Sequence, residues 1–372
     1  MTSIIYVGMD VHTTNYTLCC YSMEDDRFFA EVQVEPDAKN ILKYLARIEK
    51  QQSRDCRIVC GYEAGCLGYS LYHQLHAHGI DCVILAPTTM MTKPGKRIKT
   101  DRRDARLISK CLAFHTYSPV YIPTEMDDAV KEYIRMRDDA NSALARVKQQ
   151  IIAFCIRHGK IHDGKSYWTN KHLEWLSSLD LGNKILSEVL QEYLIRYYQL
   201  REQVDMYDMR INELAQAEPY RLKVEKLGCF RGIAAHTALS FCVEVGDFRR
   251  FATAQQFASY LGLVPGECSS GDKQQYTGIT KAGNSHLRKL LVETAQVFGR
   301  SATKSGKSVA LKERQAKCDS LTVAYADKAN ARLKKKYFKI AMRSKANIAK
   351  TAVAREMACF IWGMMTDNIS CA

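Results

Sequence analysis

The stretch IIYVGMDV (residues 4–11) is the first of three short β-rich runs, and NYTLCCYSM (15–23) and FFAEVQVE (28–35) follow it. Val, Ile, Tyr and Phe are frequent in these runs, and such side chains favour strands. The polar turn EDDR separates the second run from the third. Three consecutive strands joined by tight turns predict an antiparallel meander.

Helices and strands alternate after the meander. The segment DAKNILKYLARIEKQ (37–51) places Ile41, Leu42, Leu45 and Ile48 on one helical face. A fourth strand is expected at 56–64, a second helix at 67–79 and a fifth strand at 81–87. Strand-helix-strand repeats imply a parallel section of sheet. The order βββαβαβ followed by a helix resembles the layout of a ribonuclease-H-like domain.

Four acidic residues are candidates for a metal centre. Asp10 lies in an apolar strand, where a charge must be paired or bound to a cation. Glu63 ends the fourth strand. Asp101 and Asp104 are three residues apart, so a helix would present both on one face, with Thr100 as its N-cap.

Such hard oxygen ligands suit Mg²⁺ or Mn²⁺. Two of these ions about 4 Å apart can activate an attacking oxygen and stabilise a leaving oxygen in phosphodiester transfer. Each acid taken singly has another interpretation, because Asp104 could pair with Arg103 or Arg106 and Glu63 could cap a helix.

Long helices are predicted between residues 123 and 220. In the first, apolar residues step by three and four at Leu144, Val147, Ile151 and Phe154. In the second, an a/d seam continues through Leu186, Leu190, Tyr193, Tyr197, Leu200, Val204, Tyr207, Ile211 and Leu214. The pattern favours a coiled-coil arm, formed either within one chain or between two chains, and an ordinary helical bundle is the alternative.

The part from 221 to 372 is predicted to be mostly helical. The stretch LGCFRGIAAHTALSF (227–241) has the outline of a helix-hairpin-helix, whose turn would present backbone N–H groups to a DNA phosphate. The stretch GECSSGDK holds Ser269 and Ser270 before a glycine. A serine hydroxyl can attack a phosphodiester if it is activated, although a Ser-Ser-Gly loop by itself is commonly just a loop.

Positive charge is concentrated toward the C-terminus. The chain has 54 Lys and Arg against 40 Asp and Glu, a net charge of +14. Residues 281 to 360 hold 19 basic and 5 acidic residues, a difference of +14, so the rest of the chain is neutral. A basic block beside a neutral body suits a phosphate-rich partner, and a solvated surface is the alternative. The candidate nucleic-acid-binding residues are Lys96, Arg97, Lys99, Arg102, Arg103, Lys281, Asn284, Arg288, Lys334, Lys335 and Lys336.

Other features limit the class of protein. The 14 cysteines form no C-x-x-C pair, so a structural zinc site has no support. The N-terminus lacks the basic start of a signal peptide. No apolar run reaches the roughly 18 residues of a membrane span. We therefore expect an intracellular protein in a reducing compartment.

Several motifs together resemble one known family. GMDVH (8–12), YEA (62–64) and KTDRRDA (99–105) are similar to the signature of the DEDD transposases of the IS110 family of bacterial insertion sequences, which are related to the pilin-gene invertase. LGCFRGIAAHTA, VGDFRRF, YLGLVPGECSSG and GITKAGNSHLRKLL then resemble the family's transposase domain, in the same order. The resemblance extends from residue 4 to about residue 300.

The resemblance implies a domain of RuvC type at 1–122, a helical coiled-coil region at 123–220 and a transposase domain at 221–372. It implies that Asp10, Glu63, Asp101 and Asp104 bind Mg²⁺ and that Ser270 is the nucleophile, with Ser269 as a possible substitute. The implied partners are target and donor DNA, a structured bridge RNA, and further copies of the chain in dimers that pair into tetramers. The implied location is the bacterial cytoplasm, at the nucleoid.

Two other functions stay open at the level of sequence. A metal-only, structure-specific DNA nuclease similar to a junction resolvase would need the four acids but not the serine. A non-catalytic relative would bind nucleic acid and cleave nothing.

Overall fold

The computed structural model describes residues 3–52, 56–65, 67–90, 100–267, 276–300 and 306–369. The chain divides into two compact units, Met1–Ile122 and Pro123–Ala372, and each has hydrophobic clusters of its own. The second unit holds both the helical middle and the C-terminal region, so the division into three domains stays a prediction.

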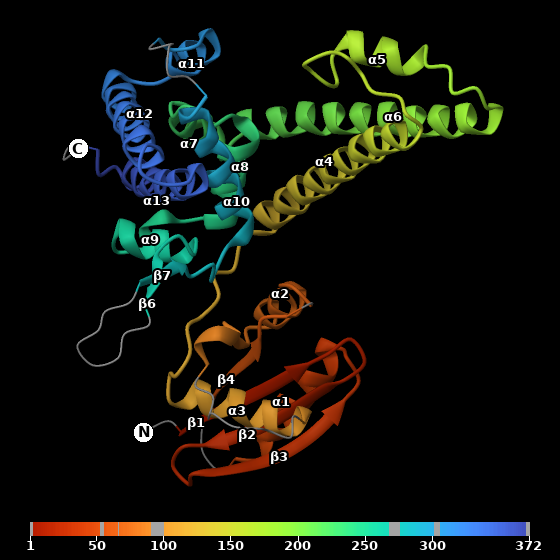
Figure 1. The fold of residues 1–372 in the computed structure, drawn as a ribbon. Helices are drawn as coiled ribbons and strands as arrows, with labels where there is room; N and C mark the ends of the chain where they lie inside the picture. The colour runs from red at the N-terminus through yellow and green to blue at the C-terminus, as the bar shows by residue number, and fades with distance from the viewer. Residues whose placement is uncertain are drawn as a thin grey trace. The chain divides into compact units, whose positions relative to one another are not determined.

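The first unit is built on a five-stranded sheet in the order β3-β2-β1-β4-β5 (Figure 1). Strand β1 pairs antiparallel with β2, and β2 pairs antiparallel with β3, whereas β1 pairs parallel with β4 and β4 with β5. The predicted meander and parallel section are therefore confirmed. The strands are β1 (Ser3–Val11), β2 (Tyr16–Ser22), β3 (Arg27–Val34), β4 (Cys56–Glu63) and β5 (Asp81–Leu85).

Helices cover both faces of this sheet. They are α1 (Ala38–Gln51), α2 (Ser70–Ala77) and α3 (Asp101–Ala113), and a short 3-10 turn (Pro87–Thr89) follows β5. Ile5, Val7 and Met9 of β1 pack in one cluster with residues of α1 and α2, whereas Tyr6 packs in another with α3. Because side chains alternate along a strand, the even-numbered residues of β1 face α3.

Gly8 lets α3 lie directly on β1. A Cβ atom at Gly8 would overlap the backbone of Ala105 and Ser109, and one at Gly61 would lie 2.8 Å from the side chain of Leu112. Helix and strand therefore approach at the backbone of β1. This contact fixes the first turn of α3, with Asp101 and Asp104, against the end of β1 that carries Asp10.

Two helices of 33 residues, α4 (Glu125–Arg157) and α6 (Lys184–Gln216), dominate the first part of the second unit. They run antiparallel, because Tyr133 contacts Tyr207 while Phe154 contacts Tyr193. Every seventh residue of the predicted seam is buried in α6, at Leu190, Tyr197, Val204 and Ile211. A third helix, α5 (Asn170–Ser177), adds Leu173 and Leu176 to the same cluster, so a two-stranded coiled coil and a contact between chains stay predictions.

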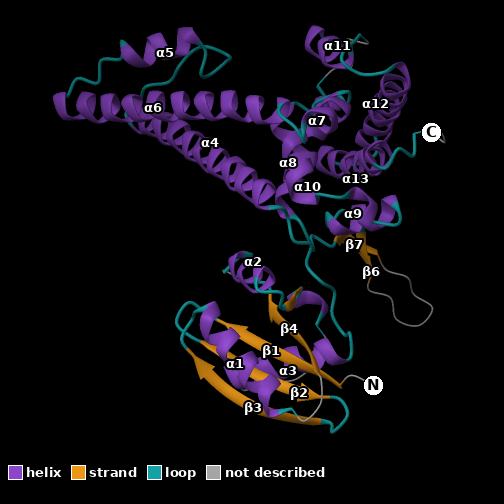
Figure 2. Cartoon of the chain, turned by 180° about the vertical axis from the view of Figure 1, so that it is seen from behind, coloured by secondary structure: helices purple, strands orange, loops and turns teal. Residues whose placement is uncertain are grey.

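The rest of the described second unit is helical apart from one hairpin (Figure 2). The hairpin pairs β6 (Pro265–Glu267) with β7 (Tyr276–Ile279). The helices are α7 (Arg221–Gly228), α8 (Ala235–Val245), α9 (Ala254–Tyr260), α10 (Ser285–Ala295), α11 (Val309–Gln315), α12 (Ser320–Ala341) and α13 (Ala346–Met365), with 3-10 turns at Phe248–Arg250 and Gln296–Phe298. None of the described helices is both long enough and apolar enough to cross a membrane.

The predicted helix-hairpin-helix segment does form two helices, α7 and α8, around Gly232, which has a φ of 87°. Its turn is packed inside the unit, because Phe230 and Ile233 are fully buried. The backbone N–H of Arg231 donates to Asn330 Oδ1 at 2.9 Å. That N–H is already satisfied by the protein, so the turn has one donor fewer for a phosphate than the motif suggests.

Candidate metal centre and nucleic-acid interface

Asp10 lies near the C-terminal end of β1, on the face that α3 covers. Its side chain is 14% exposed, and His12 Nε2 lies 3.3 Å from Asp10 Oδ2. The geometry of this contact forms no hydrogen bond, so the buried Oδ2 atom has no hydrogen-bond partner among the described residues. A buried carboxylate oxygen in this state is costly unless a cation or proton compensates it.

Two more carboxylates come from the first turn of α3. As predicted, Thr100 caps this helix by accepting a hydrogen bond from Arg103 N at 3.4 Å. Burial raises the pKa of Asp10, and the charges of Asp104 and Asp101 raise it further, while His12 opposes them. A shift in this direction means that the pocket repels a lone anion and favours a positive charge beside it.

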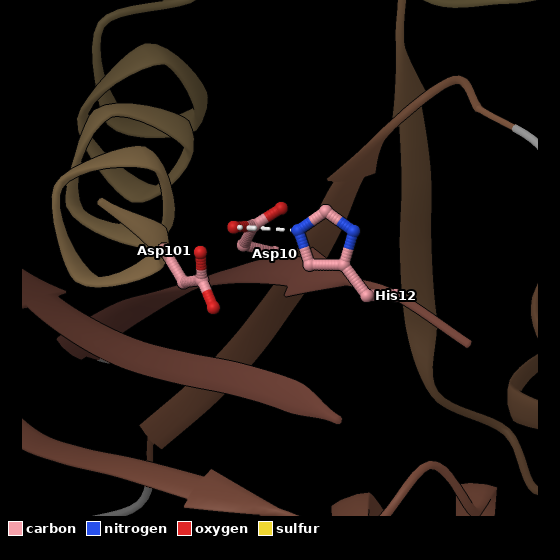
Figure 3. A group of neighbouring side chains, drawn as sticks. All are labelled: Asp10, His12 and Asp101. Atoms are coloured by element: carbon pink, nitrogen blue, oxygen red, sulfur yellow. Dashed lines mark ion pairs between the residues drawn. The ribbon is translucent and has the colours of Figure 1, made fainter. Parts of the chain in front are cut away.

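Asp10, His12 and Asp101 form a group that can hold a metal ion. Each offers one ligand atom, and these atoms lie within 4.8 Å of one another (Figure 3). Two carboxylates, one of them with an unpartnered oxygen, are the ligands that hard divalent cations prefer. The residues therefore fit a divalent cation.

Glu63 is placed beside this group by the backbone. Met9 is in register with Tyr62, so Asp10 and Glu63 follow at neighbouring positions of two parallel strands. Gly61 faces α3, and alternation puts Glu63 on that same face. Its side chain is exposed, and its carboxylate is not a member of the group within 4.8 Å.

His12 was not among the residues predicted for this site. It comes two residues after Asp10, directly after the end of β1, and its side chain is half exposed. The pattern Asp-x-His was visible in the sequence, since residues two apart on an extended chain point to the same side. The contact with Asp101 depends on the packing of α3, which the pattern does not give.

The basic residues near α3 are partly used inside the protein. Arg102 Nε lies 3.3 Å and Arg106 Nε 2.7 Å from the carboxylate of Glu31 on β3. These pairs tie α3 to the edge strand, although most of the Arg102 side chain stays exposed. Arg103 is exposed. Lys96, Arg97 and Lys99 lie outside the described residues.

The candidates around α10 also have structural contacts. Asn284 caps the helix by accepting from Leu287 N at 3.0 Å, and its Nδ2 donates to Glu244 Oε2 at 3.0 Å. Arg288 Nη1 donates to Leu261 O at 2.9 Å. Lys281 has a φ of 56° and is exposed. The role of these residues in nucleic-acid binding stays a prediction.

On α12, Lys335 is exposed, Lys334 is half-buried, and Lys336 Nζ lies 2.5 Å from Glu356 Oε2. The candidate nucleophile Ser270 and its neighbour Ser269 lie outside the described residues, in the segment between β6 and β7.

A partly buried network of charged side chains joins α4, α8 and α10. Asp138 carboxylate oxygens lie 2.9 Å from His236 Nε2 and 2.8 Å from His286 Nε2, and His286 Nδ1 lies 3.4 Å from Glu244 Oε1. The hydrogen bond between His286 Nε2 and Asp138 and the nearby carboxylate of Glu244 overcome the effect of burial and raise the pKa of His286 to about 9. These contacts also hold the pKa of Asp138 and that of Glu244 below their ordinary values, against the effect of burial. Sequence reasoning missed this network because its members are far apart in the chain.

Comparison with known proteins adds the family. A family model described as "Transposase IS116/IS110/IS902 family" matches residues 225–314. A second transposase model, for the DEDD domain of IS110 elements, matches residues 7–156, a range that contains Asp10, Glu63, Asp101 and Asp104.

Similar proteins cover most of the chain. A putative transposase, y4qE, from Sinorhizobium fredii is 36% identical over 307 residues, which are 82% of this chain and 75% of that protein. The transposase of insertion sequence element IS1533 from Leptospira borgpetersenii is 32% identical over 90% of this chain and 95% of its own length. The transposase of element IS1111A from Coxiella burnetii is 25% identical over 68% of this chain and 71% of its own length. The chain therefore belongs to the IS110 family of DEDD transposases, and it is a DNA transposase of an insertion sequence.

Proposed function

We propose that this transposase cuts and rejoins DNA strands through a serine nucleophile, Ser270, assisted by a divalent cation, Mg²⁺ or Mn²⁺, at Asp10, Glu63, Asp101 and Asp104. The observation that carries the metal part is the buried Oδ2 atom of Asp10, which has no hydrogen-bond partner in the described part of the chain and lies beside Asp101 and His12. A cation bound there would stabilise the charge that develops on phosphodiester oxygens.

Different residues of the chain would bind the metal and attack the phosphate. The carboxylates on β1 and α3 hold the ligand geometry, because the contact at Gly8 fixes the helix on the strand. In the attack, the Ser270 Oγ–P bond forms while a P–O bond to the deoxyribose breaks. The serine proton passes to a base or water, and the DNA strand leaves with a hydroxyl end. One phosphodiester replaces another, so the reverse step can rejoin DNA without an energy source.

The choice of sites is proposed to depend on a structured bridge RNA that pairs with target and donor DNA. This proposal rests on the family resemblance. The basic stretch from 281 to 360 supports it, because its positive charges could neutralise phosphates of both DNA and RNA. Assembly into dimers and tetramers is proposed on the same resemblance.

A serine-linked intermediate is the first test. We expect wild-type protein with Mg²⁺, DNA and its RNA to give a covalent protein–DNA adduct that survives denaturing electrophoresis. Ser270→Ala should lose the adduct and keep nucleic-acid binding, because the substitution removes only the attacking oxygen. Ser269→Ala is the matched control and should keep the adduct. An adduct that persists when both serines are replaced would eliminate the serine mechanism.

A metal-only nuclease is the second candidate, and one observation favours it. The group that can hold a metal ion among the described residues, Asp10, His12 and Asp101, belongs to the first unit. A nuclease of this kind would nick DNA with Mg²⁺ equally well as wild type and as Ser270→Ala. Loss of nicking in Ser270→Ala would support the serine mechanism and exclude the metal-only nuclease.

A further inference from the structure

A groove of about 1050 Å³ lies in the second unit between the β6–β7 hairpin and the helices α12 and α13. Leu263, Pro265 and Ile279 line it on the hairpin side, and Lys336, Arg355 and Phe360 line it on the helical side. All of its lining residues lie between 254 and 368, so the groove belongs to one unit.

The helical side of the groove carries an excess of positive charge. Arg332, Lys336 and Arg355 line it together with a single acid, Glu356, which gives a net charge of +2. Glu356 is shared, because it pairs with both Arg332 and Lys336. Arg355 is exposed and forms no salt bridge with any acid in the described part of the chain. The groove therefore keeps uncompensated cations that suit an anionic ligand.

The same groove has an apolar floor with aromatic side chains. Trp362 is held by its indole N–H, which donates to Phe251 O at 3.0 Å. The ring of Phe360 packs edge-on against Tyr325 at 5.8 Å, and the Arg332 guanidinium lies 5.9 Å from the Phe360 ring centroid. Aromatic surface beside cations is the composition that binds unpaired nucleic acid, since bases stack on rings while phosphates meet Lys and Arg.

The start of α13 adds to this arrangement. Asn347, Ile348 and Thr351 of its first turns line the groove. The N-cap residue, Lys345, makes no capping hydrogen bond with its side chain. Backbone N–H groups at such a helix start favour a phosphate nearby, in support of the cations already described.

The occupant follows from these properties. A duplex hides its bases in the stack and would leave the apolar floor without a partner, whereas an unpaired strand offers both bases and phosphates. We propose that this groove binds an unpaired DNA strand; the assignment to DNA rests on the function proposed above.

Binding of single-stranded DNA to the full-length protein tests the proposal. The probe is a fluorescein-labelled dT20 strand in EDTA, so that no strand cleavage contributes. The groove pair Lys336→Gln with Arg355→Gln should raise the Kd roughly tenfold at 0.15 M salt and lower the salt slope by about 0.7 for each phosphate that is no longer neutralised. The control pair Lys328→Gln with Lys339→Gln removes the same charge from exposed positions of α12 outside the groove. It should change the Kd by less than about threefold.

Weaker binding could also result from misfolding, so a variant that is expected to bind more tightly is needed as well. Thr351→Lys adds a cation to the groove on a helix that tolerates Lys, and it should lower the Kd for dT20. An equal Kd for the two double variants would overturn the proposal, as would an unchanged Kd for Thr351→Lys. Groove-dependent binding that favours rU20 or a duplex over dT20 would also overturn it. Because no serine chemistry is measured, failure here leaves the covalent-adduct test of Ser270 intact.

Discussion

At Asp10, burial and two neighbouring carboxylates act together against the charged form of a single side chain. Such a charge needs compensation, and the Oδ2 atom, which has no hydrogen-bond partner among the residues that the structure describes, indicates where that compensation would act. The neighbouring His12, whose Nε2 lies 3.3 Å from this oxygen, acts against the rise in the pKa of Asp10.

Asp10→Asn should separate stability from metal binding. Without metal, the variant should melt at a higher temperature than wild type, because a buried charge and its repulsion by Asp101 and Asp104 are gone. With free Mn²⁺ at about a hundred times its Kd, wild type should gain about 2.7 kcal/mol of unfolding free energy, and the variant should gain nothing. Thermal unfolding in EDTA and in Mn²⁺ measures both effects.

Glu24→Gln is a suitable control, since it removes an exposed acid that follows β2 at the opposite end of the β1–β2 pair from Asp10. It should keep the full Mn²⁺ effect. If Asp10→Asn responds to Mn²⁺ as wild type does, the cation binds elsewhere.

Sequence reasoning at this scale predicts candidates but not their contacts. Asp10 stands out because a charge in an apolar strand needs a partner, and Asp101 and Asp104 stand out by their spacing. His12 carries an equally simple signal, two residues from Asp10, which the predicted set of four acids leaves out. Ser270 shows the opposite limit: its identity as a nucleophile rests on resemblance, and it lies outside the described residues.

At the scale of elements, the sheet was predictable and the packing of α3 on it was not. Alternating apolar residues and short turns predict the meander, and the strand-helix-strand order predicts the parallel pairs. The approach of α3 depends on the absence of a side chain at Gly8. A glycine in a strand permits such an approach without saying which distant helix will use it.

The stability of the region where α4, α8 and α10 meet is expected to depend on pH because of His286. Its pKa of about 9 in the folded protein lies above the ordinary value of 6.5, so the folded state binds the proton more tightly than the unfolded state. The resulting stabilisation is complete below about pH 6.5 and disappears as the pH rises through about 9. Asp138 and Glu244 have lowered pKa values and stay charged over this whole range.

We therefore expect the unfolding free energy of the second unit to fall by up to about 3 kcal/mol between pH 6.5 and 9. Urea unfolding followed by tryptophan fluorescence reports this unit alone, because Trp168, Trp175 and Trp362 all belong to it. His286→Gln should flatten the dependence, whereas the exposed His158→Gln should leave it as in wild type. Equal slopes for wild type and His286→Gln would show that another group titrates.

At the scale of the whole molecule, the proposed chemistry is divided between the two units. The carboxylates belong to Met1–Ile122, while Ser270 and the basic stretch belong to Pro123–Ala372. The sequence predicts this division from its separate motif sets. It does not predict the groove beside α13, because that groove combines a hairpin and two helices whose residues show no shared pattern.

Because of this division, a complementation experiment can test whether one reaction uses residues from two chains of the proposed dimer. Asp10→Asn lacks a working carboxylate set, and Ser270→Ala lacks the nucleophile, so each alone should be inactive in strand joining. If one reaction takes its carboxylates from one chain and its serine from another, a mixed dimer retains one complete set, composed of the first unit of the Ser270→Ala chain and the serine of the Asp10→Asn chain. With equal mixing, roughly half of the dimers are of this kind, and recombination should reappear.

Mixing Asp10→Asn with Asp104→Asn is the matched control: both defects lie in the first unit, so every dimer lacks an intact carboxylate set and activity should stay absent. Inactivity of the first mixture, with mixed dimers demonstrated by two affinity tags, would mean that each chain uses its own serine with its own carboxylates.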